Sequence, residues 1–141
     1  MKSDITKVIG ILALGGITLA VTANIAFNRS AKGRFGTSNP MTYMEAQVEL
    51  GMNADAVARA IAPDRIRYHR MQDGAIAQEL FFDLDWAPDF KCFIVYRGAS
   101  VSDIEYEQRY LGNIEPLSAE QAEEELGVTA LSGKKPANAV R

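Results

Sequence analysis

The chain opens with an apolar run unlike anything that follows it. Residues 8–21 hold no charge and only Thr18 as a polar residue, and the run extends to Phe27 with two further polar residues. A helix needs about 20 residues to cross a bilayer, so residues 1–27 predict a transmembrane anchor. The alternatives are a signal peptide cleaved after Val21-Thr22-Ala23 and a helix buried in a soluble protein.

Basic residues on both sides of the run favour a retained anchor. Lys2 and Lys7 precede it, and Arg29, Lys32 and Arg34 follow it. The excess after the run mildly favours a cytoplasmic domain, whereas a short charged leader is typical of an exported chain. We expect a single-pass protein of the inner membrane with its domain in the periplasm. Small residues would let this helix pack closely on another: Gly10, Ala13, Gly16 and Ala20.

After the run, residues 28–41 are polar and rich in Gly and Ser, which predicts a linker. Two short helices should follow. Thr42 and Glu45 form a capping box for a helix that runs to Leu50. Asn53 is a good N-cap for a second helix, which Pro63 would end.

Alternation of apolar and polar residues then predicts four strands in two hairpins. The strands are residues 65–71, 77–85, 90–97 and 101–110. They would form an antiparallel meander whose apolar face the helices cover. The expected fold class is therefore α+β: a membrane helix, two short helices on a four-stranded sheet, and a C-terminal helix.

Three-residue loops give a register that suits both faces of this sheet. The apolar face would pair Ile66 with Phe82, Tyr68 with Leu80, Ile94 with Ile104, and Cys92 with Tyr106. The opposite face would pair opposite charges: Arg65 with Asp83, His69 with Glu79, and Lys91 with Glu107.

The chain should end in a short acidic helix and a tail. Ser118 and Gln121 form a second capping box, and the helix would close at Leu126-Gly127. Residues 127–141 are small, polar and basic, which predicts disorder. The α+β domain would therefore span residues 42–126.

Two stretches resemble the BamE/SmpA-like family of small envelope domains: "LGMNADAVARAIAP" and "KCFIVYRGASVSDIE". The resemblance covers about residues 42–110 and implies two helices on an antiparallel sheet in the periplasm. Members are typically lipoproteins attached through a cysteine after the signal peptide. No cysteine lies near residue 23 here, so lipid attachment, a role in barrel assembly and functional residues are not carried over.

Charge and cysteine content narrow the functional classes. The net charge is −3, with a basic start and an acidic remainder, which argues against nucleic-acid binding. Cys92 is the one cysteine, so the chain cannot form an internal disulfide, nor a structural zinc site with its single histidine. The layout is typical of a membrane-targeted chain.

No catalytic or metal site emerges from the remaining residues. His69 opposite Glu79 suggests a surface pair, and Cys92 on an apolar face lacks a base. Asp83, Asp85 and Asp89 lie close together, but the glycine and terminal glutamate of a calcium loop are missing. We expect no enzyme activity, metal or cofactor.

Apolar residues on the outer sheet face suggest a docking site: Phe81, Phe93 and Val95. Ordinary exposed surface, or cover by the C-terminal helix, is the alternative. The sequence favours a membrane-anchored, non-enzymatic module of the cell envelope that binds another envelope protein. The alternative is an accessory or assembly subunit that contacts an inner-membrane complex through its helix, with lipid as the further partner.

Overall fold

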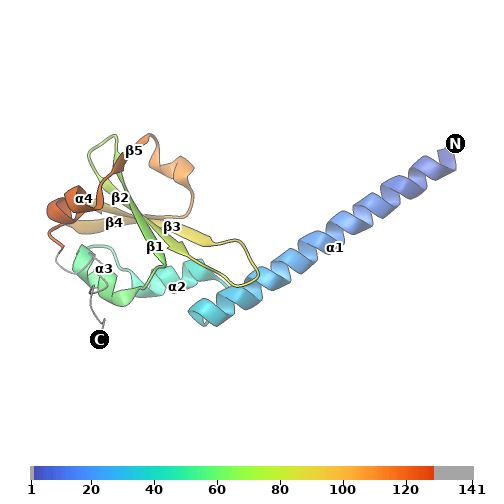
Figure 1. Cartoon of the computed structure of the whole chain (residues 1–141), viewed down its shortest axis with the longest axis horizontal. Coiled ribbons are helices and arrows are strands. Elements are labelled where there is room, and N and C mark those ends of the chain that lie inside the picture. The colour runs from blue at the N-terminus through green and yellow to red at the C-terminus, as the bar shows by residue number, and fades with distance from the viewer. Residues whose placement is uncertain (1, 129–141) are drawn as a thin grey trace, which may run out of the picture. The chain divides into compact units, whose positions relative to one another are not determined.

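A computed structural model describes residues 2–128, with side chains from residue 17 onward (Figure 1). Helix α1 spans Lys2–Phe35 and forms one unit with residues 84–88. The second unit holds residues 41–83 and 89–128. Among the described residues, no helix combines the length and the apolar character needed to cross a membrane.

The transmembrane helix predicted for residues 1–27 is therefore wrong. Within the described part of the helix the apolar run is interrupted by Thr18, Thr22, Asn24 and Asn28; Thr22 donates to the Thr18 carbonyl, and the Asn28 amide donates to the Asn24 side chain. Residues 28–35, predicted as linker, form the last turns of α1. Ala20 is exposed, whereas the predicted packing positions Gly10, Ala13 and Gly16 precede residue 17 and their exposure lies outside the described set.

The second unit carries three α-helices. Asn53 caps α3 as predicted, its side chain accepting the Ala56 N–H at 2.8 Å. Ser118 likewise caps α4, which ends at Gly127 in the left-handed region. The Thr42 cap is wrong, because Thr42 lies inside α2. The bounds are Pro40–Gln47 for α2, Ala54–Ala60 for α3 and Ala119–Leu126 for α4. The predicted disordered tail falls almost wholly outside the described residues.

The sheet has five antiparallel strands rather than the predicted four (Figure 1). The four predicted strands are present in meander order, and a fifth joins the far side of β1, giving the order β4-β3-β2-β1-β5. A crossing segment with a short 3-10 helix, η1 (Gln108–Leu111), connects β4 to β5. The strands are Arg65–Met71, Ile76–Phe82, Phe90–Arg97, Ser100–Glu105 and Ile114–Leu117.

The first hairpin lies two residues out of the predicted register. Ile66 pairs with Leu80 instead of Phe82, because the three-residue loop is residues 72–74 and ends at Gly74 with φ 86. The shift is even, so each side chain keeps its predicted face. In the second hairpin Ile94 pairs with Ile104 as predicted, up to an irregularity at Val95/Tyr96.

The inner face of the sheet, which carries Ile66, Leu80 and Ile94, packs on helices of the same unit and forms the main core (Figure 1). Tyr96 donates a hydrogen bond to Gln78 at 3.0 Å, and Gln78 donates to Tyr68 at 3.3 Å, so these buried polar groups are satisfied. Cys92 is fully buried, as predicted. Burial raises the pKa of its thiol to about 12.

Candidate protein-binding edge

The outer face, opposite the helices, is divided into a covered and an uncovered half. Phe93 and Val95 are 0% and 1% exposed, so they are not the surface residues that the sequence predicted. Leu111 of the crossing segment and Ile114 at the start of β5 pack over them. The same core cluster includes Ala75, Ala77 and Met71.

Around Phe81, the third predicted docking residue, the outer face is open and basic. Phe81 is half-buried. The charged groups of Arg65, Arg67 and Lys91 lie 4.7, 5.1 and 6.0 Å from its ring centre, which is cation–π distance. Phe81 therefore organises cations instead of offering an apolar patch.

These three cations differ in their other partners. Arg65 lies 3.2 Å from Asp89 and 3.8 Å from Asp83, which gives a structural role to two of the three aspartates considered for calcium. Lys91 pairs with Glu79 at 3.2 Å. Arg67 is exposed, and among the described residues its guanidinium makes no ion pair or hydrogen bond. Arg67 is thus available to an external anion.

Glu79 on β2 bridges two residues of this basic half, His69 and Lys91. Its two carboxylate oxygens lie 2.7 Å from His69 Nε2 and 3.2 Å from Lys91 Nζ. Burial by itself would raise the pKa of Glu79, but the bonds from His69 and Lys91 outweigh it and hold the pKa below its usual value. The predicted His69–Glu79 pair exists, although it is largely buried and diagonal, since His69 pairs across the strands with Ala77.

Beside this half, β1 has an uncovered edge. β5 pairs only with Tyr68–Met71 and ends at Leu117, where the chain turns into α4. Pro116, opposite His69, has no N–H to donate, and the Met71 N–H bonds to Ala75 on the β2 side. By alternation, Tyr68 and Arg70 bond to β5. Ile66 therefore directs its N–H and C=O toward a side where the described chain places no strand.

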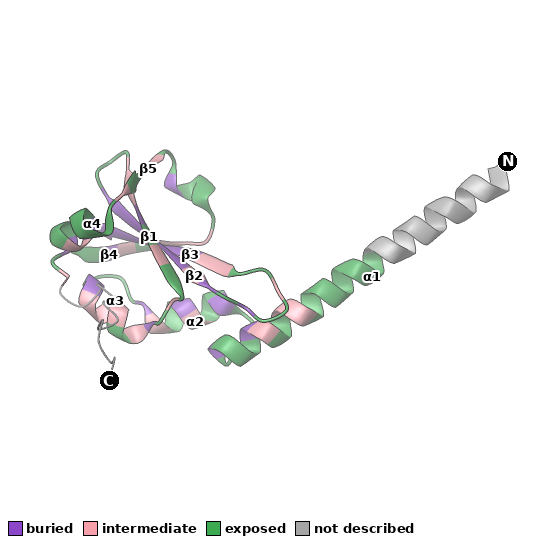
Figure 2. Ribbon diagram, viewed as in Figure 1, coloured by how far each residue is buried: buried purple, intermediate pink, exposed green. Residues whose placement is uncertain are grey.

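A pocket of about 370 Å³ lies at this uncovered edge. Ile66, Tyr68 and Leu117 supply apolar walls, and Arg67 and His69 lie on the outer-face side. The remaining lining residues are Pro116 and Ala119. Figure 2 shows the first part of β1 in exposed and intermediate colours. An extended segment placed here would pair with β1 beyond the point where β5 ends.

The opposite edge of the sheet, at β4, is closed. Gly51 donates to the Val101 carbonyl and Val101 donates to the Met52 carbonyl, both at 2.8 Å. Further along, the Asp103 carboxylate accepts the Ile104 N–H at 2.9 Å. A strand could add here only by displacing these bonds.

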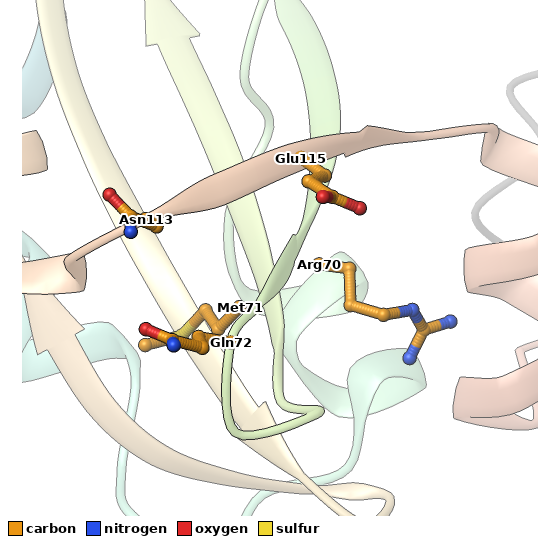
Figure 3. A pocket seen from close by; sticks show the side chains of 5 residues that line it. All are labelled: Arg70, Met71, Gln72, Asn113 and Glu115. Atoms are coloured by element: carbon orange, nitrogen blue, oxygen red, sulfur yellow. The ribbon is translucent and has the colours of Figure 1, made fainter.

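A second pocket, also about 370 Å³, lies at the turn end of the β1–β5 ladder, and all its lining residues except Met71 are polar or charged (Figure 3). Glu115 comes from β5 and Met71 from the end of β1, while Asn113 immediately precedes β5 and Gln72 immediately follows β1. The Arg70 side chain extends away from Met71 and Gln72 and pairs with Glu125 of α4. Because the Arg70 guanidinium is already paired with Glu125, it is not available to an external anion as Arg67 is.

Trp86 is a further exposed feature that the sequence analysis did not single out. Its side chain is 93% exposed and its φ is 63, a region that non-glycine residues rarely occupy. It belongs to the unit that contains α1 and is not part of the β1 edge.

Comparison with protein-family models, curated proteins and solved structures gave no match to this chain. The BamE/SmpA-like resemblance therefore stays a prediction.

Proposed function

We propose that this protein is a non-enzymatic binding module that holds an extended segment of a partner protein against Arg65–Arg67. One observation carries the proposal: half of β1 is uncovered beside an apolar pocket, while the β4 edge is closed by its own chain. Main-chain hydrogen bonds to an edge strand supply affinity, and pockets for alternate side chains supply specificity. The cell-envelope location stays a prediction.

The two edges offer a matched pair of variants. Ile66 and Ile104 are both half-buried isoleucines on the inner face of their strands. Ile66→Pro removes the N–H that a partner strand would use, whereas Ile104→Pro removes an N–H already bound by Asp103. Proline is tolerated on a strand where its nitrogen faces away from the neighbouring strand.

The test is a selection of linear ten-residue peptides on the full-length protein, followed by affinity measurements on both variants. Circular dichroism first establishes that each variant is folded. We expect Ile66→Pro to weaken selected peptides at least tenfold and Ile104→Pro to leave them within about twofold. Bound peptide should also slow hydrogen exchange of the Ile66 amide. Peptides that bind Ile66→Pro normally and leave this amide unchanged would refute the proposal.

A further inference from the structure

We infer that the partner segment carries an acidic–apolar–acidic triplet, which binds opposite Arg65, Ile66 and Arg67. This inference rests on the proposed function and adds the chemistry of its ligand. Neighbouring strands align their side chains on the same faces of a sheet. A segment added to β1 would therefore present one residue beside Ile66 on the inner face and its two neighbours on the outer face.

The outer-face positions favour acids. Arg67 is exposed and makes no ion pair or hydrogen bond among the described residues, and Arg65 lies beside it across Phe81. Opposite charges directly across a strand pair are stabilising, and like charges are destabilising. A carboxylate can also take a paired hydrogen bond from the flat guanidinium of Arg67.

The inner-face position favours an apolar side chain and disfavours an acid. Its walls are Ile66, Tyr68 and Leu117. Burial raises the pKa of the Tyr68 hydroxyl, and the negative charge of Glu123 raises it further. A carboxylate buried against these apolar walls would be left without a compensating partner, which is costly. The opposite phase, apolar–acidic–apolar, would fit neither face.

A second copy of the chain is a poorer occupant of this edge. Antiparallel pairing of two β1 edges about Ile66 would place Arg65 of each copy opposite Arg67 of the other. The chain does contain Asp103-Ile104-Glu105, which has the inferred pattern. That triplet lies in folded β4, with its Ile104 N–H bound to Asp103 and neighbouring Val101 paired to Gly51 and Met52. A free segment of a different protein meets neither obstacle.

The test uses three capped seven-residue peptides with the full-length protein. The first is Gly-Ser-Glu-Val-Glu-Ser-Gly, the second replaces both Glu by Lys, and the third has the opposite phase, Gly-Ser-Val-Glu-Val-Ser-Gly. We expect the first to bind at least tenfold more tightly than the others and to weaken as salt is raised. The Arg67→Glu variant should lose the first peptide and gain the Lys peptide. Arg109→Glu, an exposed change on the crossing segment, is the control.

The outcomes separate the two proposals. If all three peptides bind equally, lose affinity in Ile66→Pro and ignore Arg67→Glu, the edge binds strands but the inferred triplet is wrong. If neither substitution affects binding, both proposals fail. Sedimentation of the protein alone tests whether a second copy of the chain occupies the edge. Self-association that weakens with salt and is abolished by Arg67→Glu would make the partner a second copy and overturn the inference.

Discussion

β4 lies along one edge of the sheet, with Val101 paired to Gly51 and Met52, whereas on the other side β5 covers only Tyr68–Met71 of β1. The charges at the two edges differ as well. Asp103 and Glu105 follow the closed edge, and Arg65 and Arg67 flank the open one.

The comparison shows two ways to manage an exposed strand. Unpaired backbone groups at a sheet edge invite association with other chains. At β4 the chain itself occupies the N–H and C=O of Val101 and the N–H of Ile104. At β1 the groups stay open, but flanking arginines repel a second copy of the same edge. An edge of the second kind can select its partner by charge.

The largest expected effect comes from removing the core under the crossing segment that leads to β5. Phe93→Ala deletes a fully buried ring, and such changes cost about 3–5 kcal/mol. Phe81→Ala is the control on the uncovered half of the same face, and its half-buried ring should contribute about 1 kcal/mol. Urea unfolding measures both. Equal losses would show that the two halves are not covered differently.

The next effect concerns the chain that closes the β4 edge. Asn53 caps α3 and forms an isolated bridge to Ser100, so Asn53→Ala should cost about 1 kcal/mol. It should also speed hydrogen exchange at the Val101 amide. Asn113→Ala, an exposed amide beside β5, serves as control and should be nearly neutral. An unchanged Val101 amide would mean that the edge is closed without help from the α3 cap.

Local patterns in the sequence predict much of the fold. Features that depend on pairing between distant parts of the chain could not be predicted in this way. The bounds of β1 and β3, the caps at Asn53 and Ser118, and the face assignments along β1, β2 and β3 follow from alternation and capping chemistry. The register of the first hairpin was missed because Ala75 was included in its loop. Gly74 was the available signal, since three-residue hairpin loops commonly end with a residue in the left-handed region.

The fifth strand was missed for a different reason. β5 has four residues and contains Pro116, so its own pattern is weak, and its partner β1 lies far away in the chain. Without β5, the pattern extends the fourth strand to Tyr110 and predicts Phe93 and Val95 on an exposed face. The open edge of β1 is defined by where β5 stops, so it could not be predicted from the sequence either.

A smaller, pH-dependent effect is expected from Glu79, which lies in the basic half of the outer face. The pKa of Glu79 is lower in the folded protein than in an unfolded chain, where it is about 4.3. The ionised form is therefore favoured by folding, so Glu79 stabilises the protein above that pH and less as pH falls through its folded pKa. In urea unfolding from pH 7 to 3, Glu79→Gln should flatten the loss of stability. Exposed Glu124→Gln should not, and equal flattening by both would contradict the bridging role of Glu79.

The smallest expected effect concerns the acidic residues of β4, Asp103 and Glu105. Burial raises the pKa of Glu105, and the neighbouring Asp103 carboxylate raises it further, opposite in sign to Glu79. Asp103→Asn removes that second contribution and keeps a side chain of similar shape. The pKa of Glu105, followed by NMR titration of its carboxyl carbon, should fall but stay above the usual value, because burial remains. Stability should change by less than about 0.5 kcal/mol, and Glu79 in the same spectra should not move. A Glu105 pKa unaffected by the substitution would mean that Asp103 acts on the Ile104 N–H alone, and that the two edges differ in hydrogen bonding but not in the charge a partner meets.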